Sequence, residues 1–428
     1  MVDVLIRGKV DDIAIEDGKF TAIGPGLDLK AKREVDAREL LILPGVIDVH
    51  VHFNEPGREH WEGASTGSRA FAAGGGTLYF DMPLNSTPCT VGVDEFAEKR
   101  ARLQQTSVTD FGLWGGIIPG NRSALAELAG LGAIGFKAFM SDSGLPEFPR
   151  SDDLTLYEAM VEASKLDLPI AVHAENDEIT RELSRRAQAE GRTGIRDYLN
   201  SRPVIAEVEA ITRASLLARE AKAKLHIVHI SSGRGVAAAL EARALGTDIS
   251  IETCAHYLFF TDEDMERIGA AAKCAPPLRP SADRADLFTR LRAGEIDIVA
   301  SDHSPAPLEM KQDANFFKVW GGIAGVQSTL AVLLNTDRLP AEAIARLLSA
   351  NPAKRFRIPH KGAIAVGNDA DLVLIDPTAE YKLQATDLHQ RHAISPYIGS
   401  RFRGAVRQTF VRGIDAPQHP RGRFVRPA

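Results

Sequence analysis

The chain has 428 residues, of which 44% are hydrophobic and 25% are charged. This is the composition of an ordinary soluble globular protein, and it excludes disordered and fibrous classes. The formal net charge of −6 comes without a long basic run, so the sequence gives little support to a nucleic-acid-binding surface. We interpret the arginine group from Arg401 to Arg412 as part of a solvated surface.

The first predicted elements are short β-strands. Residues 2–6, 12–16 and 19–23 alternate apolar and polar side chains and are separated by glycines. The far end of the chain has a similar pattern, with β-type runs at 362–366, 370–375 and 405–411. We therefore predict that the two chain ends, residues 1–43 and 353–428, build one small β-sandwich domain.

Residues 44–352 alternate strand-length apolar runs with longer amphipathic or alanine-rich segments. The strand-like runs are 41–49, 77–82, 111–117, 134–140, 169–174, 225–230, 249–254 and 296–301. Segments of helical length and composition lie at 93–105, 151–167, 203–222 and 281–293. Eight successive βα units favour an α/β fold of the (β/α)8 barrel type. An open doubly wound sheet is the alternative, but its glycine-rich phosphate turn should follow the first strand, and Gly74-Gly75-Gly76 precedes a strand instead.

Potential metal ligands fall at the carboxyl ends of these predicted strands, where barrel enzymes carry their chemistry. His50 and His52 end the first strand and, being two residues apart in an extended chain, project to the same side. His173, His229 and Asp302 end the fifth, sixth and eighth strands. Each of these residues alone is more simply interpreted as a loop or core residue. Because barrel closure brings the strand ends around one cavity, we expect a site for one metal ion, or for two if an anion bridges them.

Lys137 is the candidate for that bridge. It stands in GFKAFM near the end of the fourth strand, between Phe136 and Phe139, where a charged ammonium is poorly placed. A deprotonated lysine amine could react with carbon dioxide to give a carbamate, whose two oxygens can each bind one metal ion. A solvated strand-end lysine is the alternative. His226 lies on the opposite face of its strand from His229, so we assign it a structural role.

The ordered set His50-Val51-His52, Lys137 in GFKAFM, His173 in VHAEN, His229 in HIVHISS and Asp302 in SDHSP resembles the cyclic amidohydrolase family nearly end to end. This family includes dihydroorotases, hydantoinases and allantoinases, and the stretches that resemble allantoinases most closely are 50–63, 81–88, 201–211, 273–279 and 320–328. The resemblance implies two divalent metal ions held by His50, His52, Lys137, His173, His229 and Asp302, with Lys137 N6-carboxylated and bridging. Zinc is the expected metal, although iron, cobalt or manganese suits the same ligands.

Two departures from sister enzymes bear on the substrate. Dihydroorotases carry an arginine two residues after the HxH pair, where it binds a substrate carboxylate, and this chain has Asn54 there. Arg58 is near in sequence but does not match that position. Dihydropyrimidinases and hydantoinases usually carry a tyrosine five residues after the bridging lysine, and this chain has Asp142. A neutral substrate such as allantoin is therefore expected.

The predicted substrate contacts are side-chain amides and exposed backbone, because allantoin is rich in amide donors and acceptors. They are Asn54, Asn85 and the backbone near Ala275 and Gly321. For Asn85, which follows a proline and a leucine, a turn residue is an equal alternative.

These observations lead to a hypothesis of catalysis: hydrolysis of the ring amide of allantoin to allantoate. A hydroxide generated between the two metal ions attacks the amide carbonyl, while Asp302, as ligand and base, passes the proton of water to the departing nitrogen. His256 and His303 are either partners behind the ligands or satisfied structural histidines. A hydantoinase or dihydropyrimidinase is one alternative, and a catalytically silent scaffold relative is another, although such relatives typically lose metal ligands.

The three cysteines, Cys89, Cys254 and Cys274, form no CxxC pair, which argues against a disulfide framework and favours a reducing compartment. No apolar run approaches the ~18–20 residues that span a bilayer, and the first ten residues lack a signal-peptide pattern. We therefore expect a cytoplasmic protein without a membrane partner. The family resemblance further implies a homo-oligomer, with a homotetramer expected.

Overall fold

The apolar runs of the central region form the strands of a closed barrel in the computed structural model, which describes residues 1–336, 339–416 and 421–428. One parallel sheet has the strand order β14-β13-β12-β11-β10-β9, and a second has the order β6-β7-β8. The strands are β6 (Val46–Val51), β7 (Gly76–Asp81), β8 (Asp110–Leu113), β9 (Gly115–Gly116), β10 (Phe136–Phe139), β11 (Ile170–His173), β12 (Leu225–Ile227), β13 (Ile249–Cys254) and β14 (Ile298–Ala300).

Two junctions unite these sheets. Only Trp114 separates β8 from β9, so these two short segments together make one strand of the barrel. A parallel bridge between Val51 and His303 then connects the end of β6 with the segment after β14. Within the described residues, eight parallel strands therefore form a closed barrel, and the predicted barrel is confirmed.

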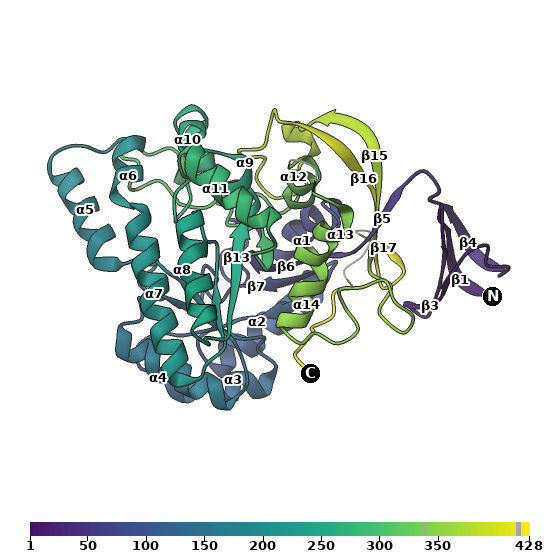
Figure 1. Ribbon diagram of the computed structural model, residues 1–428, viewed down its shortest axis with the longest axis horizontal. Coiled ribbons are helices and arrows are strands. Elements are labelled where there is room, and N and C mark those ends of the chain that lie inside the picture. Colours follow the sequence, from purple (N-terminus) through teal and green to yellow (C-terminus); the bar gives the residue numbers. More distant parts are fainter. Residues whose placement is uncertain (337–338, 417–420) are drawn as a thin grey trace.

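Helices cover the outside of the barrel, as Figure 1 shows for α3, α4, α7 and α8. Each helix that the sequence predicts is present within two residues of its expected bounds. The helices are α1 (Ala64–Ala73), α2 (Val93–Thr106), α3 (Leu125–Leu131), α4 (Asp153–Lys165), α5 (Asp177–Ala189), α6 (Ile195–Ser201), α7 (Val204–Ala221), α8 (Gly233–Ala244), α9 (Ala255–Phe259), α10 (Asp262–Ile268), α11 (Ser281–Arg292), α12 (Thr329–Asn335), α13 (Ala341–Ala345) and α14 (Asn351–Arg355). Among the described residues, no helix has both the length and the apolar character that crossing a membrane requires.

Strands from both chain ends build two further sheets beside the barrel (Figure 1). One has the order β3-β2-β1-β4 and the other the order β17-β16-β15-β5. Their bounds are β1 (Val2–Arg7), β2 (Asp12–Glu16), β3 (Lys19–Gly24), β4 (Ala31–Asp36), β5 (Leu41–Pro44), β15 (Leu372–Lys382), β16 (Arg401–Val411) and β17 (Ile414–Ala416). Ile6, Ile13 and Phe20 of the first sheet pack with Leu372 and Phe410 of the second, so a shared apolar core makes the pair a β-sandwich.

The structure corrects three details of the sequence analysis. The run 41–49 is two strands, because Leu41–Pro44 pairs with β15 and only Val46–Val51 enters the barrel. Residues 362–366 form turns and no strand, with Gly362 in the left-handed region at φ 84°. Residues 421–428 return to the barrel, where Phe424 bridges to Phe111 of β8. The division into 44–352 and the two chain ends stays a prediction.

The arginine group also divides. Arg401, Arg403 and Arg407 are exposed on β16, which agrees with a solvated surface. Arg412 is buried and forms an ion pair with Asp110 at the start of β8, so the solvated interpretation is wrong for this residue. Its guanidinium is held there because Asp110 offers a buried carboxylate between the barrel and the sandwich.

Candidate active site

Five of the six predicted metal ligands lie at or next to the carboxyl ends of barrel strands, and Lys137 is the second residue of β10. His50 is in β6, His52 is the first residue after β6, and Asp302 is the second residue after β14. Ligand atoms of these three side chains lie within 4.8 Å of one another. The Nε2 atom of His50 is 3.3 Å from Asp302 Oδ1, and that of His52 is 3.5 Å from the same oxygen.

His173 and His229 complete the ring of imidazoles. His173 Nδ1 lies 3.0 Å from His229 Nε2, and the ring centroids of His229 and His50 are 5.4 Å apart. His229 and Asp302 both have left-handed backbone, at φ 40° and 46°. Left-handed backbone is uncommon outside glycine and clusters at functional sites. Here the left-handed backbone occurs just after two barrel strands, where the chain directs the His229 ring and the Asp302 carboxylate toward the other predicted ligands.

Two buried glutamates hold the outer edges of these rings. Glu252 Oε1 is 2.9 Å from His50 Nδ1, and Glu175 Oε2 is 2.8 Å from His173 Nε2. A carboxylate accepts a hydrogen from the ring nitrogen it faces, so the other nitrogen of a neutral imidazole keeps its lone pair. Both rings therefore present a lone pair to the shared centre, which is the usual support of a metal-binding histidine.

Lys137 lies on β10 with its side chain fully buried, and its Nζ has no hydrogen-bond partner among the described residues. Burial lowers the pKa of Lys137 to about 8, although Glu252 and Asp302 act in the opposite direction. A measurable fraction of the amine is therefore uncharged near neutral pH. An amine in this state can react with carbon dioxide, whereas an ammonium cannot.

Asp302 is ionised despite its environment. Burial alone would raise its pKa, but the neighbouring His50 and His52 rings outweigh burial and hold the pKa of Asp302 below its usual range. Its side chain keeps 13% of its surface exposed, so the carboxylate remains open to the cavity. The arrangement thus offers an accessible proton acceptor beside the imidazoles.

The donor set fits divalent metal ions. Within the described residues, the Nζ of Lys137 is buried without a partner. Buried polar atoms are nearly always satisfied in folded proteins, so this amine near the imidazoles and Asp302 indicates a missing ligand. Imidazole nitrogens with one carboxylate are the donors that zinc and related divalent ions bind.

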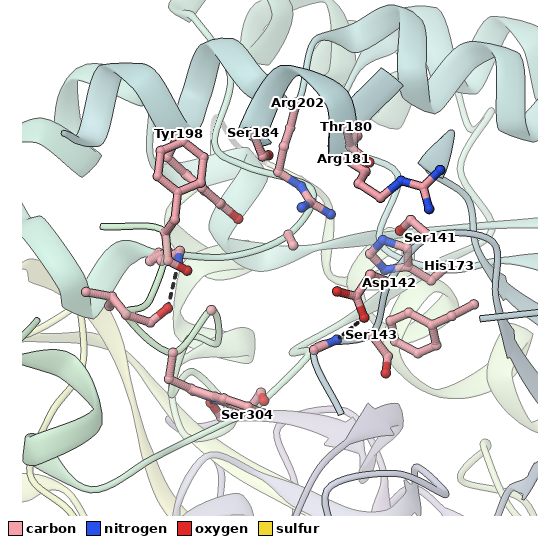
Figure 2. A pocket seen from close by; sticks show the side chains of 18 of the residues that line it. Ser141, Asp142, Ser143, His173, Thr180, Arg181, Ser184, Tyr198, Arg202 and Ser304 are labelled. Carbon is pink, nitrogen blue, oxygen red and sulfur yellow. Dashed lines mark hydrogen bonds between the residues drawn. The ribbon is translucent and has the colours of Figure 1, made fainter. Parts of the chain in front are cut away.

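A cavity of about 540 Å³ opens over this centre. His50, His52, His173, His229 and Asp302 form its floor, and its walls include Asn85, Ser304, Ala275 and Gly321. The Asn85 side-chain nitrogen lies 3.3 Å from Ser304 Oγ, so an amide and a hydroxyl stand side by side on one wall. Figure 2 shows Ser304 across the cavity from Tyr198, in the middle of α6, and from Arg202, which directly follows α6.

Asn54 does not belong to this wall. Its side chain is fully buried, and its Nδ2 donates to the carbonyl of Pro305 at 3.4 Å. Asn54 supports the loop that follows Asp302, and a contact between Asn54 and the substrate stays a prediction. Asp142, by contrast, lines the cavity and accepts the amide hydrogen of Gly144 at 3.0 Å (Figure 2).

The remaining histidines have different surroundings. His226 bonds to Ser250 and, through Nε2 at 2.8 Å, to Glu252, so it fixes the glutamate that orients His50. His303 accepts hydrogen bonds from two backbone amides, those of Gly325 and Val326, which agrees with a structural role. His256 is buried beside the centre, and burial lowers its pKa to about 4.

The sequence analysis missed Glu175, Glu252, Arg202 and Ser304. A signal existed for two of them: Glu252 is the one charged residue of the strand ISIETC, and Glu175 follows His173 by two residues. Arg202, which forms an ion pair with Glu175, had no signal, because its approach depends on where α6 ends over the barrel.

Comparisons with known proteins agree with this site. A model of the amidohydrolase family matches residues 41–414. The chain is 64% identical over 412 residues to an allantoinase of Solibacter usitatus, covering 95% of this chain and 90% of the relative. It is 53% identical over 443 aligned positions to an allantoinase of Rubrobacter xylanophilus, covering 99% and 98%.

Among solved structures, the L-hydantoinase (dihydropyrimidinase) from Arthrobacter aurescens superposes with a TM-score of 0.96 at 33% identity, covering 100% of both chains. A dihydropyrimidinase from Brevibacillus agri superposes with a TM-score of 0.90 at 28% identity. These findings confirm the resemblance inferred from the sequence, and the chain belongs to the amidohydrolase family.

Proposed function

We propose that this protein hydrolyses the ring amide of allantoin to allantoate. The observation that carries the proposal is the 64% identity to an allantoinase along 95% of the chain, in a protein whose strand ends gather four histidines and an aspartate. Loops at the strand ends decide substrate choice in barrel enzymes, so a match that covers 95% of the chain supports a shared substrate.

We further propose that His50, His52, His173, His229 and Asp302, with an N6-carboxylated Lys137 between them, hold two divalent ions, which we expect to be zinc. Such ions lower the pKa of bound water toward ~7 and polarise a carbonyl oxygen. Carboxylation joins the Lys137 nitrogen to the carbon of carbon dioxide and releases one proton, which leaves an anion with two oxygens. The buried, unpartnered amine of Lys137 supports this modification.

Asp302 is the proposed proton carrier. Its open carboxylate accepts a proton from the attacking water and returns it to the ring nitrogen that departs when the amide bond breaks. The Asn85 amide, the Ser304 hydroxyl and the backbone near Ala275 and Gly321 supply donors and acceptors that match a small neutral amide. The cavity of about 540 Å³ is large enough for such a ligand.

The structural similarity to an L-hydantoinase supports one second candidate, hydrolysis of hydantoin or dihydrouracil. Asp142 argues against it, because the side chain on that wall is a carboxylate bonded to Gly144 and carries no phenol hydroxyl. We also expect a cytoplasmic homotetramer, which the comparisons leave open.

A turnover assay on allantoin, hydantoin and dihydrouracil with one metal-quantified preparation tests the proposal. We expect kcat/KM for allantoin to exceed the other two by about 100-fold or more, a ratio that a few differing hydrogen bonds produce. We also expect close to two divalent ions per chain. Faster turnover of hydantoin or dihydrouracil would establish the second candidate, and fewer than one ion per chain with no turnover would favour a scaffold protein.

A further inference from the structure

Two stretches of backbone form one wall of the cavity, residues 273–276 and 316–322. Lys273 and Ala275 line the cavity from the first stretch, and the second stretch contributes Phe317, Lys318, Val319, Trp320 and Gly321. The first stretch is fixed by two tyrosines, because Tyr198 donates to the Cys274 carbonyl at 2.8 Å and Tyr257 to the Pro276 carbonyl at 2.6 Å. Neither stretch belongs to a barrel strand, and side chains add to the few backbone hydrogen bonds that hold the second one, such as that from Trp320 to Met310.

Lys273 connects the two stretches. Its side chain is buried, and its Nζ donates to the carbonyl oxygens of Phe316 at 2.6 Å and Val319 at 2.5 Å, with Phe317 at 3.2 Å. Its Cε lies directly beneath Gly321, 3.9 Å from the position that a Cβ on this glycine would take. One lysine thus gathers the carbonyl groups that precede Gly321 and supports the glycine itself.

Lys311 holds the same stretch from the other side. Its buried Nζ donates to the carbonyl oxygens of Trp320 at 2.9 Å and Gly322 at 2.7 Å, and to Ala270 at 3.2 Å. The carbonyls of Val319, Trp320 and Gly322 are therefore all occupied by two ammonium groups. Gly321 lies between these anchors with its backbone at the cavity surface.

Neither ammonium has a carboxylate partner among the described residues. The charged groups that act on Lys273 are Lys311 and Arg202, and both are repulsive, while the rings of Tyr198 and Phe316 lie 4.5 and 5.2 Å from its Nζ. Burial lowers the pKa of Lys273 and of Lys311 to about 7. Burying two like charges costs free energy that apolar packing would avoid. The benefit is geometric, because each ammonium directs several carbonyl groups at once.

We propose that Lys273 and Lys311 are positioning residues that hold the stretch 316–322 against the cavity, so that the backbone of Gly321 is preorganised to bind a cyclic amide. The proposal rests on the function proposed above for its substrate and deepens it. A backbone with fixed orientation binds a neutral amide without an ordering cost, which is how preorganisation raises affinity. Neither lysine is one of the predicted metal ligands, so the proposed proton transfer is left to Asp302.

Hydrogen–deuterium exchange and steady-state kinetics on Lys273→Met and Lys311→Met test this role. The amide of Trp320 donates to the Met310 carbonyl at 2.9 Å and that of Phe316 to the Thr193 carbonyl at 2.9 Å, so both report on the stretch. We expect each variant to speed exchange in residues 312–323 about tenfold. KM for allantoin should rise about tenfold, the factor that ~1.4 kcal/mol produces, with kcat within about twofold of the native value and the metal content unchanged.

Lys318→Met is the matched control for the exchange measurement only, because it removes the same charge from the same stretch, and exposed Lys318 itself lines the cavity. Unchanged exchange in 312–323 together with unchanged KM would overturn the proposal. So would faster exchange throughout the barrel strands, or a fall in kcat with loss of metal at unchanged KM. If Lys273→Met does not fold, Lys273→Gln, which keeps an N–H donor, carries the same comparison. If the native protein hydrolyses no cyclic amide, the proposed function fails, and the exchange measurements still decide whether the two lysines order this stretch.

Discussion

His50 Nδ1 lies 2.9 Å from Glu252 Oε1, with both side chains buried at the end of the barrel. The second carboxylate oxygen of Glu252 is 2.8 Å from His226 Nε2. The glutamate is thus held from behind and directs the lone pair of His50 Nε2 toward Asp302. An imidazole with a fixed tautomer and orientation binds a metal ion without an additional free-energy cost for orienting the ring.

Glu252→Gln should therefore weaken metal binding by about 10–100-fold, the usual effect of removing a carboxylate behind a metal-binding histidine. Competition with a chelator of known affinity measures the change. Glu207→Gln is the matched control, since Glu207 is also buried but bonds to Ser231 and Ser232 and to no histidine. Equal metal affinity in the native protein and the Glu252 variant would contradict the proposed support.

Asp302→Ala should lower kcat for allantoin by about 10²–10⁴-fold, the contribution of a positioned general acid–base group. At least one metal ion should remain, because the four histidines are unchanged. Metal analysis and single-turnover kinetics on the same preparation separate the two effects. Activity near the native level in this variant would remove Asp302 from the proposed mechanism.

Lys137→Met should separate folding from metal binding. The Nζ of Lys137 has no hydrogen-bond partner among the described residues, so an apolar side chain of similar length should not lower the free energy of unfolding of the metal-free protein. Metal content should fall from two ions per chain to one or none, because the proposed bridging anion is lost. Thermal unfolding in chelator and metal quantitation test the two halves. A strong loss of apoprotein stability would show that Lys137 is structural.

Lys361→Met should destabilise the junction of barrel and sandwich. The buried Nζ of Lys361 lies 2.7 Å from Asp110 and 2.6 Å from Asp371. Removing one partner of a buried ion pair costs about 3–5 kcal/mol. Denaturant unfolding measures this loss, and Lys19→Met is the control, because exposed Lys19 is 3.5 Å from Asp369 and such surface pairs contribute about 0–1 kcal/mol. A loss no larger than that of the control would contradict the prediction.

The stability difference between native protein and Lys361→Met should depend on pH in a defined way. Burial alone lowers the pKa of Lys361, but Asp371 and Asp110 outweigh it and raise the pKa above its ordinary value. A raised lysine pKa stabilises the fold fully below the unfolded value of ~10.4, and this contribution is lost as pH rises through the folded value.

The lower limit of this pH range is set by Asp110 and Asp371. Burial raises the pKa of Asp110, but Lys361 and Arg412 outweigh burial and lower the pKa. The contribution of Asp110 is therefore present above ~3.9 and is lost as pH falls through its folded pKa. Burial outweighs Lys361 and raises the pKa of Asp371, so the pairing of Asp371 with Lys361 is complete only above that raised pKa. We expect a plateau from there to the upper limit, and a maximum outside this window would contradict the prediction.

Much of the site was predictable because the ends of barrel strands can be located from the sequence alone. The alternation of apolar runs and helical segments located the strands, and His50, His52, His173, His229 and Asp302 follow from reading where each run ends. Barrel closure then requires these ends to meet, whatever the detailed packing. The neighbouring Phe136 and Phe139 make Lys137 a candidate, but its role as a bridge rests on the family resemblance, since no local pattern distinguishes it from a solvated lysine.

The order of the residues is thus enough to identify the groups that face the centre, because strand order and side-chain alternation are local properties of the chain. The groups that lie behind and above them depend on how distant parts of the chain pack together. Glu252 reaches His50 from a different strand, Asn54 donates to Pro305, and Lys273 and Lys311 bond to carbonyls that lie 43 and 11 residues further along the chain. Such contacts depend on how loops fold over the barrel mouth, and no periodicity in the chain encodes the direction of a loop.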